Sequence, residues 1–365
     1  MITDQISKAG TSIWLDDLSR AKLTGVDPHS LPHRIKNDGI VGITTNPSIF
    51  NAAISQGTEY AEAIAGLKGK SADEVLKILT TDDVRNACDL FTPAYEKSDG
   101  VDGRVSIEVD PRLARDTART VVQGKALWAT VDRPNVLIKV PATIEGLDAI
   151  TELTTEGICV NITLIFSVER YLRVFDAFMK GLEARLAAGK ELSSITSVAS
   201  FFVSRIDSSV DSLLNADPSP THTSLLGRAA IANAALAYEA FEGVRNSTRW
   251  QNLEKAGARI QRPLWASTGV KDPNYDDTRY VMNLIARDTV NTMPQKTLDA
   301  VIDHGVFTGS TISSLYRDSH EVFDALEKVG ISMAQVTRDL EIDGVEKFEA
   351  AWIDLLANVE KSLST

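Results

Sequence analysis

Residues 135–143 read Asn135-Val136-Leu137-Ile138-Lys139-Val140-Pro141-Ala142-Thr143, an apolar run that carries one lysine and is closed by a proline. Val, Ile and Leu in such a short run favour a buried strand. Burying an unpaired ammonium group is costly, and the usual relief is a lowered pKa that leaves a neutral, nucleophilic amine. Such an amine can attack a carbonyl carbon and form a Schiff base. Lys139 is therefore a candidate nucleophile, although it could instead close the strand and extend its charge to solvent.

Strand-like runs of this kind recur along the chain, each followed by a longer segment with helical spacing. The other runs cover residues 12–16, 40–44, 105–109, 159–165, 195–203, 263–267 and 298–302. Strands that alternate with helices favour parallel βαβ units, and eight such units predict the α/β class and a closed (β/α)₈ TIM barrel.

The chain is longer than a barrel requires. A barrel needs about 250 residues, so part of the 365-residue chain is left for additional helices. We predict one domain over residues 1–365, with helical insertions at about 50–100 and 208–262. The C-terminal stretch spaces its apolar residues three or four apart, which predicts an amphipathic helix on the barrel. These residues are Val345, Phe348, Trp352, Leu355, Val359 and Leu363.

Composition excludes several classes of partner. The net charge is −12 and no basic block is present, which argues against a nucleic-acid or anionic-membrane partner. No stretch approaches the roughly 20 apolar residues of a membrane span. Two cysteines, Cys88 and Cys159, are too few for a disulfide framework. We therefore expect a cytoplasmic protein, and we expect no cofactor. We also expect no metal, since Pro32 disfavours the helix that would bring His29 and His33 to one face.

Polar residues cluster where the predicted strands end, which in a barrel is the active-site face. They comprise one amine, carboxylates, amides, hydroxyls and further cations. In chain order they are Asp16, Asp17, Thr44, Thr45, Asn46, Glu108, Asp110, Lys139, Asn161, Thr163, Ser200, Arg205, Ser267 and Lys271. This set suits carbon–carbon bond chemistry through an imine.

Several of these segments together resemble transaldolase, most closely its longer bacterial type. The matching segments are Trp14-Leu15-Asp16-Asp17-Leu18-Ser19-Arg20, Gly42-Ile43-Thr44-Thr45-Asn46-Pro47-Ser48, Val105-Ser106-Ile107-Glu108-Val109-Asp110, Ile138-Lys139-Val140-Pro141-Ala142-Thr143 and Val160-Asn161-Ile162-Thr163-Leu164-Ile165-Phe166-Ser167. The resemblance implies a pentose phosphate pathway enzyme that moves a dihydroxyacetone unit from sedoheptulose 7-phosphate or fructose 6-phosphate to glyceraldehyde 3-phosphate or erythrose 4-phosphate. It also implies a monomer or homodimer.

The resemblance assigns a role to each site residue. Lys139 forms the imine with C2 of the ketose, and Asp16 takes the proton of the C4 hydroxyl. Glu108 and Thr163 hold the water of dehydration. The retained carbons are bound by Asn46, Ser106, Asn161 and Ser200, and the phosphate by Arg205 and Ser267.

The sequence departs from the family at the phosphate site. Many transaldolases carry Ser-x-Arg after the seventh strand, where this chain has Ser267-Thr268-Gly269. Lys271 is the nearest cation, and we take it as the replacement.

Other interpretations of single residues stay open. Asp16 and Asp17 could cap the following helix, and Glu108 or Asp110 could pair with a nearby arginine. Asn46 could form a plain turn, Thr163 could be a satisfied strand hydroxyl, and Arg205 could form a surface ion pair.

Two other functions also remain. A related aldolase splits fructose 6-phosphate and releases dihydroxyacetone, but it characteristically has Gln and Tyr where this chain has Glu108 and Phe202. The third candidate function is non-catalytic: the barrel would bind sugar phosphates without converting them.

Overall fold

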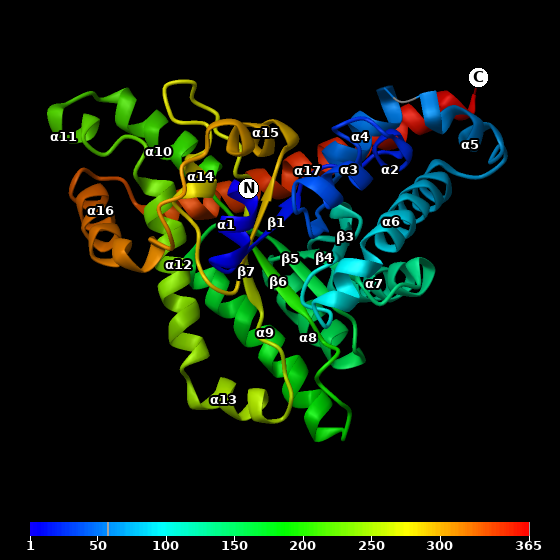
Figure 1. Ribbon diagram of the computed structural model, residues 1–365, viewed down its shortest axis with the longest axis horizontal. Helices are drawn as coiled ribbons and strands as arrows, with labels where there is room; N and C mark the ends of the chain where they lie inside the picture. The colour runs from blue at the N-terminus through cyan, green and yellow to red at the C-terminus, as the bar shows by residue number, and fades with distance from the viewer. Residues whose placement is uncertain (57, 365) are drawn as a thin grey trace.

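Eight parallel strands close into a barrel in chain order (Figure 1). The computed structural model describes residues 1–56 and 58–364, and the strand count refers to these. The strands are β1 (Thr11–Leu15), β2 (Gly42–Ile43), β3 (Arg104–Glu108), β4 (Val136–Pro141), β5 (Val160–Ile165), β6 (Ser197–Phe202), β7 (Arg262–Ala266) and β8 (Thr289–Met293). β1 pairs with β8 along its whole length and closes the ring. The predicted (β/α)₈ fold is confirmed.

The eighth strand was predicted in the wrong place. Residues 298–302 lie within α15 (Gln295–His304), whereas β8 comes earlier in the chain. Leu298 and Val301 are buried three residues apart, as on one face of a helix. β8 itself is rich in Thr and Asn, and these buried polar side chains bond to neighbouring elements; Asn291, for example, donates to the Tyr280 carbonyl of α14.

Helices surround the barrel and extend it on two sides. Those that follow β3, β4, β5 and β6 are α7 (Thr117–Val131), α8 (Ile144–Glu156), α9 (Val168–Ala187) and α10 (Ser204–Ala216). Helices α2 (Arg20–Thr24) and α3 (Leu31–Asn37) join β1 to β2, and α1 (Ile2–Lys8) precedes β1. Within the described residues, no helix combines the length and apolar character needed to cross a membrane.

The two predicted insertions are helical. Between β2 and β3 lie α4 (Pro47–Gln56), η1 (Thr58–Tyr60), α5 (Ala61–Ala65) and α6 (Ala72–Lys97). Between α10 and β7 lie α11 (Pro220–Thr223), α12 (Ala229–Arg245) and α13 (Thr248–Lys255). Shorter elements are η2 (Pro111–Leu113), α14 (Arg279–Met282) and η3 (Ile312–Leu315).

Two helices complete the chain, α16 (Tyr316–Lys328) and α17 (Met333–Leu363). Helix α17 is 31 residues long and buries Val345, Phe348, Leu355 and Val359 along one face. It packs against α4, α6, α10 and β5, and Figure 1 shows it in red crossing the molecule. The long final helix therefore spans elements on both sides of the barrel.

Candidate active site

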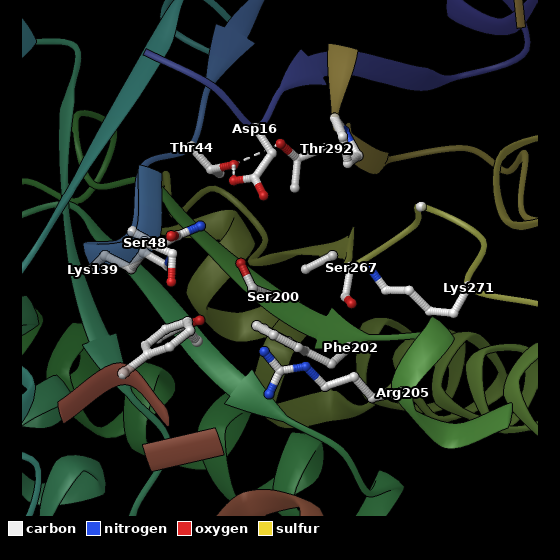
Figure 2. Close-up of a pocket in the computed structure, with 16 residues that line it drawn as sticks. Asp16, Thr44, Ser48, Lys139, Ser200, Phe202, Arg205, Ser267, Lys271 and Thr292 are labelled. Atoms are coloured by element: carbon white, nitrogen blue, oxygen red, sulfur yellow. Dashed lines mark hydrogen bonds between the residues drawn. The ribbon is translucent and has the colours of Figure 1, made fainter. Parts of the chain in front are cut away.

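A pocket of about 200 Å³ opens at the carboxyl ends of the strands (Figure 2). Ten of its lining residues are candidates from the sequence: Asp16, Thr44, Asn46, Lys139, Thr163, Ser200, Phe202, Arg205, Ser267 and Lys271. Figure 2 shows Asp16 with Thr44 and Thr292 on one side, and Phe202 with Arg205 on the opposite side. The barrel thus brings together side chains that are up to 255 residues apart in sequence (271 minus 16).

Lys139 lies inside the barrel mouth and is paired. Its Nζ lies 3.0 Å from Oε2 of Glu108, and both side chains are at most 5% exposed. The same ammonium group donates a 2.9 Å hydrogen bond to the carbonyl oxygen of Thr45. Lys139 is therefore buried but not unpaired, so the premise of an unpaired cation is wrong. The alternative, in which the lysine extends its charge to solvent, is wrong as well. Strand register explains the pairing, because Glu108 of β3 lies directly beside Lys139 of β4.

Glu108 is buried and does not line this pocket; it lines a neighbouring one, together with Asn46 and Trp352. Burial raises the pKa of its carboxyl group, with a further rise from Asp16 and an opposing effect from the Lys139 ammonium group. Asp110, the other carboxylate of this segment, pairs instead with Arg112 at 2.6 Å. Glu108 is thus the carboxylate that can exchange a proton with the candidate nucleophile.

Asp16 follows the last residue of β1 and points into the pocket. Its Oδ1 accepts a 2.6 Å hydrogen bond from Thr44, whose Oγ1 lies 2.7 Å from Oγ1 of Thr292. Burial raises the pKa of Asp16, while Lys139, Thr44 and Lys271 act in the opposite direction. The helix-cap interpretation is wrong, because Ser19 accepts the bond from the backbone of Lys22 at the start of α2.

A buried hydrogen-bonded chain joins β3, β5 and β6, and its middle residue, Asn161, lies beside Lys139 in the sheet register. Asn161 donates to Oγ of Ser106 at 2.9 Å, and Ser200 donates to Oδ1 of Asn161 at 2.7 Å. Ser106 and Asn161 do not line the pocket, and Ser200 is the member of this chain that does. The hydroxyl of Thr163 does line it, and this buried Oγ1 lacks a hydrogen-bond partner within the described residues. Thr163 is therefore not a satisfied strand hydroxyl.

Backbone irregularity separates Thr163 from the end of β5. The register between β5 and β6 shifts between Ile162 and Ile165. Leu164 has a φ of 60°, in the left-handed region that a leucine rarely adopts. Bulges of this kind are enriched beside active sites, where they redirect side chains.

The opposite end of the pocket is cationic. Arg205 stacks over the ring of Phe202 at 5.4 Å, and its buried Nη1 has no hydrogen-bond partner among the described residues. No carboxylate of the described residues lies within ion-pair distance of its guanidinium group. The interpretation of Arg205 as a surface ion pair is therefore wrong. Burial lowers the pKa of Arg205, and the charge of Asp343 opposes that change. An unpaired guanidinium group facing a pocket is suited to a phosphate or carboxylate ligand.

Ser267 and Lys271 extend this cationic end. Ser267 adopts a φ of 55° at the close of β7, and its Oγ lies 3.0 Å from Oγ of Ser204. Lys271 is exposed and reaches the same pocket from the following loop. Asn46 lines the pocket too, while its Oδ1 accepts from the backbone of Ile49 and so caps α4. Asn46 thus has a local structural role, as the turn interpretation expected, and also faces the pocket.

Sequence reasoning missed other residues of the pocket, chiefly Ser48, Thr292 and Phe348. Thr292 was missed because the eighth strand was predicted too late in the chain. Phe348 was recognised only as part of an amphipathic helix, and its place depends on α17 crossing the barrel mouth. Within the described ranges, no group of three or more His, Cys, Asp or Glu is arranged to hold a metal ion.

Comparison with known proteins covers nearly the whole chain. A family model described as Transaldolase/Fructose-6-phosphate aldolase matches residues 13–359. A protein of Mycolicibacterium smegmatis named Transaldolase is 56% identical over 354 residues, which cover 96% of this chain and 94% of that protein. Proteins of the same name from Thermobifida fusca and an Arthrobacter species are 52% and 53% identical, over 99% and 100% of this chain and 98% of each relative. The chain belongs to the transaldolase/fructose-6-phosphate aldolase family.

Proposed function

We propose that this protein is a transaldolase that transfers a dihydroxyacetone unit through an imine on Lys139. The donor is sedoheptulose 7-phosphate or fructose 6-phosphate, and the acceptor is glyceraldehyde 3-phosphate or erythrose 4-phosphate. The observation that carries the proposal is the buried amine of Lys139, which touches Glu108 and shares one pocket with Asp16 and an unpaired Arg205. We assign the reaction to the pentose phosphate pathway in the cytoplasm, as the resemblance implies.

Imine formation begins at the pair of Lys139 and Glu108. The ammonium group must lose a proton before its nitrogen attacks C2, and the Glu108 carboxylate at 3.0 Å is the nearest acceptor. The raised pKa of Glu108 favours holding that proton. Glu108 then returns it to the departing C2 hydroxyl, with the free hydroxyl of Thr163 orienting the water that leaves.

Cleavage of the C3–C4 bond is assigned to Asp16. As a carboxylate it takes the proton of the C4 hydroxyl, the C4 carbonyl forms, and the electron pair of the broken bond moves into the imine. The aldose phosphate departs and an enamine remains on Lys139. The raised pKa of Asp16 suits a group that must both accept a proton and return it to the next acceptor.

The remaining residues bind rather than react. The hydroxyl of Ser200, held by Asn161 and through it by Ser106, supports the retained three-carbon unit. Arg205, Ser267 and Lys271 form the cationic end that receives the phosphate of donor or acceptor. One phosphate site can serve both substrates because they occupy it in turn.

The nearest rival activity is cleavage of fructose 6-phosphate with release of dihydroxyacetone, which the family description also covers. Release requires a proton on C3 of the enamine. Phe202 stands where the related aldolase has a tyrosine. Its ring packs on Phe166, with 5.1 Å between ring centroids, and has no exchangeable proton to give. This favours transfer over release.

Borohydride reduction tests the proposal. Incubation with fructose 6-phosphate and borohydride should add the reduced three-carbon or six-carbon unit to Lys139, as read by peptide mass spectrometry. Lys139→Met is the control and should gain nothing. No adduct on the wild-type protein would favour a barrel that only binds sugar phosphates, and dihydroxyacetone release as fast as transfer would favour the aldolase.

A further inference from the structure

Helix α17 is held firmly across the pocket at two places. On one side of Phe348, Glu341 pairs with Arg170 of α9 at 3.1 Å. On the other side, Asn358 donates 2.9 Å hydrogen bonds to Asn51 and Ser55 of α4. The intervening stretch passes so close to β5 that a Cβ on Gly344 would lie 3.0 Å from Leu164. The helix is therefore anchored from both ends of the segment that faces the site.

Phe348 is the residue that this segment presents to the pocket. Its side chain is only 5% exposed, and the centroid of its ring lies 5.5 Å from Nζ of Lys139. It lines the same pocket as Thr163, Ser200 and Phe202. An aromatic ring thus covers the nucleophile from a direction that none of the barrel strands supplies.

The chemistry at Lys139 creates a need for such a cover. After C3–C4 cleavage, the enamine carries the electron pair of the broken bond on C3. If C3 takes a proton, the enamine becomes an iminium ion, and one water then hydrolyses it to dihydroxyacetone and the free amine. That water replaces the one lost when the imine formed, so the sequence is balanced and ends as an aldolase reaction. Transfer survives only if proton donors stay away from C3 until the acceptor arrives.

We propose that Phe348 is a specificity-determining residue that suppresses this release by excluding water from the face of the enamine beneath α17. The ring offers no exchangeable proton, and it fills space that solvent would otherwise enter from the mouth of the barrel. This inference rests on the function proposed above. It adds a residue outside the barrel that controls the partition between transfer and release.

The test measures the ratio of dihydroxyacetone release without acceptor to transfer with erythrose 4-phosphate. Phe348→Ala should raise this ratio roughly tenfold, less than the 10²–10⁴ of a positioned acid, because bulk water is a poorer donor. Phe348→Leu, which keeps an apolar wall, should leave the ratio near the wild-type value. Both rates come from the same active molecules, so a loss of folded protein cancels in the ratio.

A matched control distinguishes the effect of losing the Phe348 ring from the effect of a general loosening of α17. Leu355 is fully buried on the same helix and does not line the pocket, so Leu355→Ala should lower stability without changing the ratio. An unchanged ratio in Phe348→Ala, with the Lys139 adduct still formed, would overturn the inference. An equal rise in Leu355→Ala would overturn it as well. Absence of the adduct in the wild-type protein would instead overturn the proposed function.

Discussion

Thr44 donates a 2.6 Å hydrogen bond to Oδ1 of Asp16. Because a hydroxyl has one proton to give, the 2.7 Å contact between Thr44 and Thr292 is then a bond donated by Thr292. A relay therefore runs from β8 through the end of β2 to the carboxylate that follows β1. The relay stabilises the charged form of Asp16 against the burial that raises its pKa.

Thr44→Val should move the acidic limb of the pH profile of kcat/KM to higher pH. In the mechanism proposed above the carboxylate form of Asp16 is the active base, so loss of a bond to that form raises its pKa and removes activity at a higher pH. We expect a shift of about one to two pH units, since a hydrogen bond to a charged group contributes roughly 1.5–3 kcal/mol. Thr292→Val should give a smaller shift in the same direction. Thr120→Val, which removes a buried hydroxyl outside the pocket, should give none.

Glu108→Gln should slow imine formation on the order of 10²-fold or more, because the amide cannot take the proton from Lys139. The rate of borohydride trapping with fructose 6-phosphate measures this step. Asp110→Asn is the matched control, since Asp110 pairs with Arg112 and not with the nucleophile. Equal slowing in both variants would contradict the assignment.

Arg205→Ala should raise the KM for fructose 6-phosphate about 10- to 100-fold, which corresponds to roughly 1.5–3 kcal/mol of charged hydrogen bonding. Lys271→Ala should raise it less, about threefold, because that side chain is exposed and its charge is screened. Neither variant should change kcat/KM for unphosphorylated fructose. If Lys271→Ala left every constant unchanged, Lys271 would not be the replacement for the missing arginine.

Phe202→Tyr should raise the release of dihydroxyacetone in the absence of an acceptor. The added hydroxyl supplies a proton donor in the pocket, where Phe202 now packs between Phe166 and Arg205. Release is measured by reduction of free dihydroxyacetone in a coupled assay. No rise would show that this ring position does not govern the fate of the enamine.

Gly42→Ala should destabilise the barrel by about 1–3 kcal/mol. A Cβ at Gly42 would lie 2.5 Å from the ring of Trp14, which is fully buried and has little freedom to move. Gly243 in α12 is the control, because a Cβ there meets nothing within 4 Å. Gly243→Ala should be neutral or stabilising by up to about 1 kcal/mol. Urea unfolding of both variants measures the difference.

Seven strands could be predicted to within a few residues because their apolar runs are short and continuous. β8 could not, since it buries Thr and Asn side chains whose partners lie on other elements: Thr289 bonds to Thr11 of β1, and Asn291 to the Tyr280 carbonyl of α14. The same error concealed Thr292, which belongs to the relay on Asp16. An apolar-run criterion fails where a strand buries polar side chains that are satisfied by hydrogen bonds.

Most pocket residues were predictable because parallel strands end on one face of a barrel. Their pairing was not, because the register that sets Glu108 beside Lys139 is a property of the sheet and not of either segment. Phe348 is separated from Lys139 by more than half of the chain, and its periodicity indicates only a buried helix face. Which surface that face covers depends on how α17 packs against α4 and α10.

All eight strands precede α17 along the chain. All residues of the barrel, Lys139 included, are therefore synthesised before the segment with Phe348 has left the ribosome. The amine that we propose as nucleophile is encoded early and its cover late, so a product truncated before α17 would retain the amine without the wall beside it.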